Sequence, residues 1–90
     1  MGATIVKIKI MPSSPDINLE EIKIKAETIS KEIANSEIKI EEEPIAFGLK
    51  AVILQFSFDE SKNLESIEEK IRAIKNVSSL EIIDFRRAFG

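Results

Sequence analysis

The side chains that most often perform acid–base, nucleophilic or metal chemistry are scarce in this sequence of 90 residues. It contains neither histidine nor cysteine, which excludes a Ser-His-Asp triad, a thiol nucleophile, a disulfide and a Cys/His zinc site. Its three glycines are far apart, so no glycine-rich phosphate loop is present. Asp16, Asp59 and Asp84 are separated by predicted elements and form no carboxylate pair. We therefore predict that the protein is not an enzyme and has no catalytic residue, metal site or cofactor.

An aromatic side chain stands beside a glycine in residues 44–48 (PIAFG), at a predicted junction between a loop and a strand. Binding residues concentrate in loops, and aromatic anchors supply a large contact area at low entropic cost. Phe47 is therefore a candidate anchor for a partner. The alternative is that Phe47 covers the open end of the hydrophobic core, and the residue types alone leave both interpretations open.

Two charged clusters are equally open to interpretation. The run Glu41, Glu42 and Glu43 could contact a basic partner or a weakly held cation, although such runs are typical of the solvated end of an edge strand. Arg86 and Arg87 stand close to the last residue of the sequence. They could pair with phosphate or carboxylate groups of a partner, or remain solvated at a frayed strand end.

The elements that position these residues follow from the spacing of the apolar side chains. Residues 4–11 and 37–43 alternate between apolar and polar, which predicts strands with one buried face. Residues 49–58 are apolar on both faces and predict a central strand, and residues 79–87 predict the last one. Apolar residues recur every three or four positions over 18–34 and 63–75, which predicts two helices, with Asn18 as a cap and Asn76 as a helix end.

The predicted order is strand, helix, strand, strand, helix, strand. Right-handed crossovers and short hairpins then favour one architecture. We predict an α+β, ferredoxin-like β-α-β-β-α-β sandwich, in which both helices cover one face of a four-stranded antiparallel sheet with strand order 4-1-3-2. The length corresponds to a single domain over residues 1–90.

The sheet face that the helices leave open is predicted to be more apolar than a solvated face requires. An apolar face rimmed by charge indicates an association surface, unless a one-residue slip exchanges the two faces. An RNA-binding module and a regulatory or assembly domain are therefore alternative functions. The net charge of −3 and the lack of aromatic residues on the first strand argue against RNA. The residues assigned to this face are Ile5, Lys7, Lys9, Met11, Leu49, Ala51, Ile53, Ile83 and Phe85.

Composition places the chain among intracellular globular proteins. Hydrophobic residues make up 43% and charged residues 32% of the sequence, which is typical of a folded domain. No apolar run approaches the roughly 20 residues of a membrane span, and the first residues lack the charged-then-apolar order of a signal peptide. We therefore expect a cytoplasmic protein without membrane contact.

Three segments resemble the archaeal translation elongation factor 1-beta family, and the resemblance covers essentially the whole chain in the right order and length. They are VKIKIMP (6–12) with Ser14-Pro15, EEEPIAFGLKA (41–51) and DFRRAF (84–89). The central segment is the specific one. The family has a ferredoxin-like fold, which agrees with the independent prediction. The resemblance implies that the protein promotes exchange of GDP for GTP on elongation factor 1-alpha. This exchange regenerates the GTP form that binds aminoacyl-tRNA, and no bond is made or broken.

The same resemblance suggests which residues contact the partner. In eukaryotic relatives an aromatic residue and a glycine, at the positions of Phe47 and Gly48, pack into the GTPase, which favours the anchor interpretation. Those relatives also direct a lysine, one residue from their end, toward the Mg²⁺ and switch region. The matching residue here is Arg87, so the sequence departs from the pattern in residue type and in the three residues that follow.

The resemblance thus yields a defined set of expectations. The partner is GDP-bound or nucleotide-free elongation factor 1-alpha, without direct nucleic-acid contact, and the free protein is a monomer. The predicted partner-binding residues are Ile45, Phe47, Gly48, Lys50, Arg86 and Arg87.

Overall fold

The computed structural model describes residues 3–88 of the chain. Met1, Gly2, Phe89 and Gly90 lie outside the described residues, and with them the end of the third motif. All six predicted elements are present, and the strands begin and end within two residues of the predicted positions. The elements are β1 (Ala3–Pro12), α1 (Leu19–Ser30), β2 (Lys39–Pro44), β3 (Lys50–Asp59), α2 (Leu64–Arg72) and β4 (Val77–Ala88).

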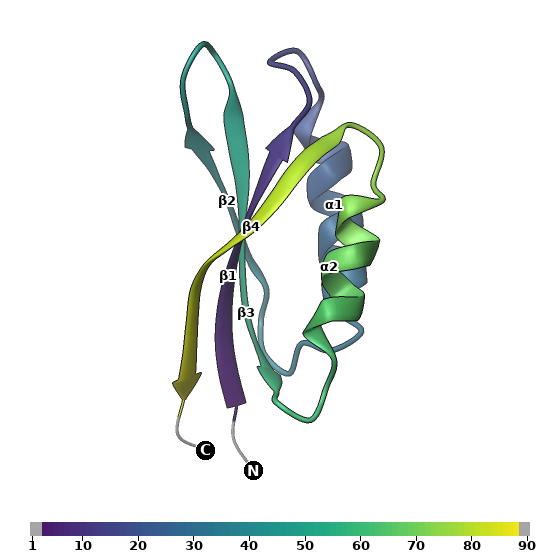
Figure 1. Ribbon diagram of the computed structural model, residues 1–90, viewed down its shortest axis with the longest axis vertical. Helices are drawn as coiled ribbons and strands as arrows, with labels where there is room; N and C mark the ends of the chain where they lie inside the picture. The colour runs from purple at the N-terminus through teal and green to yellow at the C-terminus, as the bar shows by residue number, and fades with distance from the viewer. Residues whose placement is uncertain (1–2, 89–90) are drawn as a thin grey trace.

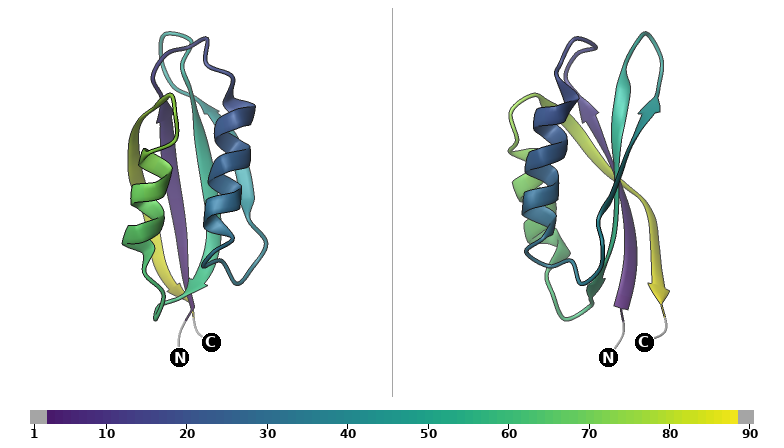
Figure 2. Two further views of the ribbon diagram at one scale, coloured as in Figure 1. Left: turned by 90° about the vertical axis from the view of Figure 1, so that its right-hand side faces the viewer. Right: turned by 180° about the vertical axis from the view of Figure 1, so that it is seen from behind.

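The four strands form one antiparallel sheet in the order β2-β3-β1-β4, which confirms the predicted topology. Figure 1 and Figure 2 show both helices packed on the same face of the twisted sheet, so the fold is the ferredoxin-like α+β sandwich. The molecule is elongated, with a longest dimension of 42 Å along the strands. The β2–β3 hairpin lies at one end of this axis, and the start of β1 and the end of β4 lie side by side at the other (Figure 1).

The core lies between the sheet and the two helices. Every second residue of β1 is buried, which is the pattern of a strand with one face against a core. Each large apolar side chain that is removed from water here contributes about 1.5–3 kcal/mol of transfer free energy. Asn18 and Asn63 cap the two helices by accepting hydrogen bonds from backbone N–H groups of the first turns. The main core residues are Val6, Ile8, Ile10, Ile22, Ala26, Val52, Leu54, Phe56, Phe58, Ile67 and Ile71.

Both helices are shorter than the apolar spacing predicts. The first ends at Ser30, after which the N–H groups of Glu32 and Ile33 bond three residues back, as in a tightening last turn. Ala34 then forms an isolated bridge with Phe58 of β3. Ile33 and Ala34 therefore continue the apolar pattern of the helix while packing against the core from a turn.

A β-bulge in β4 places Phe85 on the face of the sheet opposite to the predicted one. Ile82 lies opposite Ile8 and Asp84 lies opposite Lys7, so Ile83 is an extra residue in β4. Beyond this point the alternation is reversed relative to a regular strand. Phe85 lies opposite Val6, on the side of the helices, and its ring is 6.4 Å from that of Phe58. The prediction that Phe85 belongs to the open face is wrong, because one inserted residue exchanges the two faces.

The open face of the sheet is also less apolar than predicted. Ala51 and Ile53 do lie on it, but they are 0% and 7% exposed. Lys9 lies opposite Ile53, and its ammonium group pairs with Glu43 at 3.6 Å, so charged side chains surround the apolar ones. The expectation of an association surface on this face stays a prediction, because Ile5 and Met11 of β1 are only partly buried there.

Candidate partner-binding site

The β2–β3 hairpin ends in a tight turn that presents Phe47. The N–H of Leu49 donates to the carbonyl of Ala46 at 3.0 Å, and the N–H of Ile45 donates to the carbonyl of Leu49 at 2.8 Å. Phe47 and Gly48 both have positive φ angles, of 57° and 79°. Two consecutive left-handed residues are the requirement of a type I′ hairpin turn, which matches the twist of the flanking strands. Backbone geometry therefore fixes Phe47 at the tip.

The aromatic ring of Phe47 has no place in the core. The residue is 96% exposed, so the interpretation that it covers the open end of the core is wrong. A left-handed conformation costs a non-glycine residue roughly 1–2 kcal/mol, and a large exposed apolar ring adds a cost of solvation. Local strain of this kind is found where a side chain is held for function. Phe47 is thus an anchor candidate by exposure and by backbone conformation.

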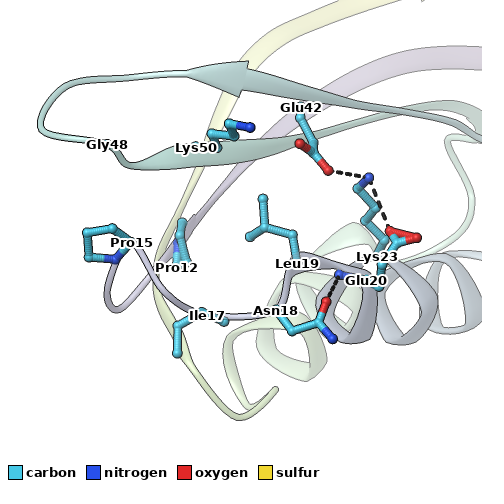
Figure 3. Close-up of a pocket in the computed structure, with 10 residues that line it drawn as sticks. All are labelled: Pro12, Pro15, Ile17, Asn18, Leu19, Glu20, Lys23, Glu42, Gly48 and Lys50. Atoms are coloured by element: carbon cyan, nitrogen blue, oxygen red, sulfur yellow. Dashed lines mark hydrogen bonds and ion pairs between the residues drawn. The ribbon is translucent and has the colours of Figure 1, made fainter.

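A three-residue ion cluster connects the hairpin to helix α1. The ammonium group of Lys23 lies 2.5 Å from a carboxylate oxygen of Glu42 and 3.2 Å from one of Glu20 (Figure 3). The hydrogen bond with Glu42 raises the pKa of Lys23, and the same bond lowers the pKa of Glu42. Two members of the acidic run are therefore in ion pairs, Glu42 with Lys23 and Glu43 with Lys9.

Below the tip, a groove of about 540 Å³ separates the hairpin from the β1–α1 loop (Figure 3). Gly48 and Lys50 line it on the hairpin side, and Pro15 and Leu19 line it on the other. A Cβ atom placed on Gly48 would lie 3.8 Å from the Cβ of Pro15, an ordinary contact. The positive φ angle, rather than a lack of space, is therefore what favours glycine at position 48.

The two arginines lie at the opposite end of the sheet and on opposite faces. Arg86 lies opposite Ile5 on the open face, and its Nε and Nη2 atoms donate to one oxygen of Asp84 at 3.1 and 2.8 Å. This hydrogen bonding lowers the pKa of Asp84. Arg87 lies opposite Thr4 on the helix side, and its Nε is 3.2 Å from Oε2 of Glu60. The two arginine side chains therefore point to opposite faces of the sheet.

The six predicted residues thus form two groups rather than one site. Ile45, Phe47, Gly48 and Lys50 gather at the hairpin, whereas Arg86 and Arg87 lie about 30 Å away along β3, at roughly 3.3 Å per residue. Sequence reasoning missed Lys23 of α1, which pairs with Glu42 below the hairpin tip, and Glu60 of the turn between β3 and α2, which pairs with Arg87. Only strand register brings Glu60 beside Arg87, and no spacing in the sequence indicates it.

The fold is a small α+β sandwich that presents an exposed aromatic residue at the tip of a hairpin. The family model described as the EF-1 guanine nucleotide exchange domain matches residues 5–88, and the chain belongs to this family. No helix among residues 3–88 is long and apolar enough to cross a membrane. Membership of this family supports a role in guanine-nucleotide exchange on elongation factor 1.

Archaeal relatives match nearly end to end. The chain is 43% identical over 88 residues to elongation factor 1-beta of Methanobrevibacter smithii, covering 97% of this chain and 98% of the relative. It is 40% identical over 88 residues to elongation factor 1-beta of Methanosarcina barkeri, covering 97% and 99%. For that of Methanococcus maripaludis the identity is 33% over 85 residues, covering 93% and 96%.

Proposed function

We propose that the protein accelerates the exchange of GDP for GTP on elongation factor 1-alpha and so regenerates the form that binds aminoacyl-tRNA. The observation that carries this proposal is the exposed Phe47, held by a tight hairpin turn in a chain of the exchange-domain family. The chain acts as one exchange domain over residues 1–90 and makes or breaks no bond itself. It is a cytoplasmic monomer when free, and it binds the GDP-bound or nucleotide-free GTPase.

The physical basis of exchange is thermodynamic linkage. If the exchange factor lowers the affinity of the GTPase for nucleotide, then bound nucleotide lowers the affinity of the GTPase for the exchange factor by the same factor. Entry of GTP therefore releases the exchange factor. GDP in such GTPases is held by a phosphate loop and by Mg²⁺ that bridges phosphate oxygens. A contact that moves the switch segments or displaces Mg²⁺ therefore raises the rate of GDP release.

Phe47 supplies the docking contact. Because its backbone is already fixed by the turn, little conformational entropy is lost when the ring enters a pocket of the GTPase. Aromatic residues of this kind contribute a large share of the binding free energy in protein interfaces. Ile45, Gly48 and Lys50 surround the tip and complete the contact at this end.

Arg87 supplies the contact that acts on the nucleotide site. A guanidinium close to bound Mg²⁺ repels the metal and pairs with its carboxylate or phosphate ligands. Arg87 is 80% exposed by side chain, which leaves it accessible to a partner. It lies about 30 Å from the hairpin tip along the strands, so a GTPase that meets both contacts must extend along the whole sheet.

Release of a fluorescent GDP from the cognate elongation factor 1-alpha tests the proposed function. Substoichiometric amounts of the protein should accelerate release, because each molecule leaves when GTP enters and acts again. A control with the protein alone should show no GTP hydrolysis. An unchanged release rate over a wide range of protein concentration would contradict the proposal.

A further inference from the structure

The two adjacent arginines use their guanidinium groups differently. Arg86 approaches Asp84 with Nε and Nη2 together, so one edge of its planar group, including a terminal nitrogen, is occupied within its own strand. Arg87 meets Glu60 through Nε, at 3.2 Å. A guanidinium held at Nε still has its two terminal nitrogens side by side for a carboxylate or phosphate.

Glu60 is itself held in place. The hydroxyl of Thr4, which is buried in β1, donates to the same Oε2 atom at 3.5 Å. Glu60 follows directly on Asp59, whose carboxylate accepts from the N–H of Ser61 at 2.9 Å and whose carbonyl accepts from the N–H of Lys62 at 2.8 Å. These two bonds fix the turn between β3 and α2, so the carboxylate stands at a set position beside β4.

We propose that Glu60 is a positioning residue for nucleotide exchange, which holds Arg87 by Nε and directs its terminal nitrogens toward the anionic ligands of the nucleotide site. The proposal rests on the proposed function. It also explains why Arg87 rather than Arg86 would act on the nucleotide site. Arg86 is bound to Asp84 on the opposite face of the sheet. The free energy involved is that of an exposed ion pair, so the effect is modest.

The test compares the maximal GDP-release rate at saturating exchange factor, and the concentration that gives half of it, for Glu60→Ala, Arg87→Ala and the double variant. We expect Glu60→Ala to lower the maximal rate about two- to fivefold, the range of an exposed ion pair, with the half-saturating concentration unchanged. The double variant should be no slower than Arg87→Ala alone, because without Arg87 there is nothing to position. If Glu60 had only a structural role, the rate losses of Glu60→Ala and Arg87→Ala would be independent, and the double variant would be slower than Arg87→Ala.

Two variants serve as controls. Glu68→Ala removes a carboxylate from helix α2 and should leave the rate unchanged. Asp84→Asn removes the carboxylate that binds Arg86 and should also leave it unchanged. If either lowers the rate as much as Glu60→Ala, the effect is one of general charge and the proposal is overturned.

The remaining outcomes separate this proposal from the proposed function. If the wild-type protein does not accelerate release, the proposed function fails. If the wild type is active but Glu60→Ala is as fast or faster, only the positioning role fails. It fails as well if Arg87→Ala is as fast as the wild type, since Arg87 is then not the acting residue.

Discussion

At the hairpin end the position of Phe47 is set by backbone dihedral angles, whereas at the other end the position of Arg87 is set by side-chain contacts. The turn fixes Phe47 through two φ angles and two backbone hydrogen bonds, and the ring itself is almost fully exposed. Arg87 has regular strand backbone, and its long flexible side chain is restrained by Glu60. One end is therefore rigid and apolar, and the other is adjustable and charged.

This difference suggests a division of roles. A rigid apolar group gains free energy by desolvation alone, so it contributes to affinity whichever nucleotide state the partner adopts. An adjustable cation gains free energy only where anionic groups become available, as they do when Mg²⁺ leaves. The hairpin end should therefore determine binding, and the strand end should determine the rate of nucleotide release.

The largest expected effect is that of Phe47→Ala on binding. Loss of an aromatic anchor should cost about 2 kcal/mol or more, which is roughly a 30-fold weaker affinity for elongation factor 1-alpha. The thermal midpoint should stay close to that of the wild type, because the ring makes almost no contact within the protein. Titration calorimetry and thermal unfolding measure the two quantities. Equal affinity of variant and wild type would remove the anchor role.

The second prediction concerns Arg87→Ala and is the counterpart of the first. The maximal exchange rate should fall about tenfold, as expected for loss of one hydrogen-bonded charge contact, while partner affinity changes little. Arg86→Ala should have a smaller effect, and high Mg²⁺ should inhibit the wild type by competing for the same place. A variant that exchanges at the wild-type rate across a Mg²⁺ titration would show that docking alone opens the nucleotide site.

The third prediction tests whether backbone geometry holds the hairpin end. Gly48→Ala should destabilise the fold by about 1 kcal/mol, because alanine is strained at a φ of 79° although a Cβ atom fits beside Pro15. Gly48→Asn is the matched control and should cost less, since asparagine tolerates left-handed backbone. Urea unfolding measures both. Equal costs would mean that side-chain volume at this position matters more than the φ angle.

The smallest predicted effect is the pH dependence of the ion pair between Lys23 and Glu42. Because folding lowers the pKa of Glu42, its contribution is present above the unfolded value of about 4.3 and is lost as pH falls through the lower folded value. Folding raises the pKa of Lys23, so its contribution is present below about 10.4 and is lost as pH rises beyond the folded value. Between these limits the pair should be insensitive to pH.

Thermal midpoints of the wild type and Glu42→Gln between pH 2 and pH 7 check the acid limit. The difference between the two proteins should be constant near neutral pH and should shrink in acid, once the wild-type carboxyl is protonated. A difference that persists unchanged at the acid limit would assign the effect to packing of the side chain rather than to its charge.

The sequence predicted element order, topology and most of the core, because periods of two and of about 3.6 residues follow directly from which faces are buried. It left the role of Phe47 undecided, since exposure depends on a turn whose two positive φ angles no spacing reveals. It placed Phe85 on the wrong face because the residue that bulges, Ile83, is apolar like its neighbours and interrupts no pattern. Glu60 depends on contacts between segments far apart in the chain, which local patterns do not encode.

The bulge at Ile83 also determines which of the two adjacent arginines, Arg86 or Arg87, points to the helix side of the sheet. In an uninterrupted strand the residues after Ile82 would keep their parity, and Arg86 rather than Arg87 would share a face with Thr4. One inserted residue exchanges the faces to which all following side chains of β4 point. Arg86 therefore lies on the open face and Arg87 on the helix side. Two chemically equivalent side chains thereby receive different surroundings, Asp84 for the first and Glu60 for the second. Deleting Ile83 should therefore close the bulge and leave Arg86 opposite Ile5 and Arg87 opposite Thr4, whereas pairing the full sequence without a bulge would exchange them.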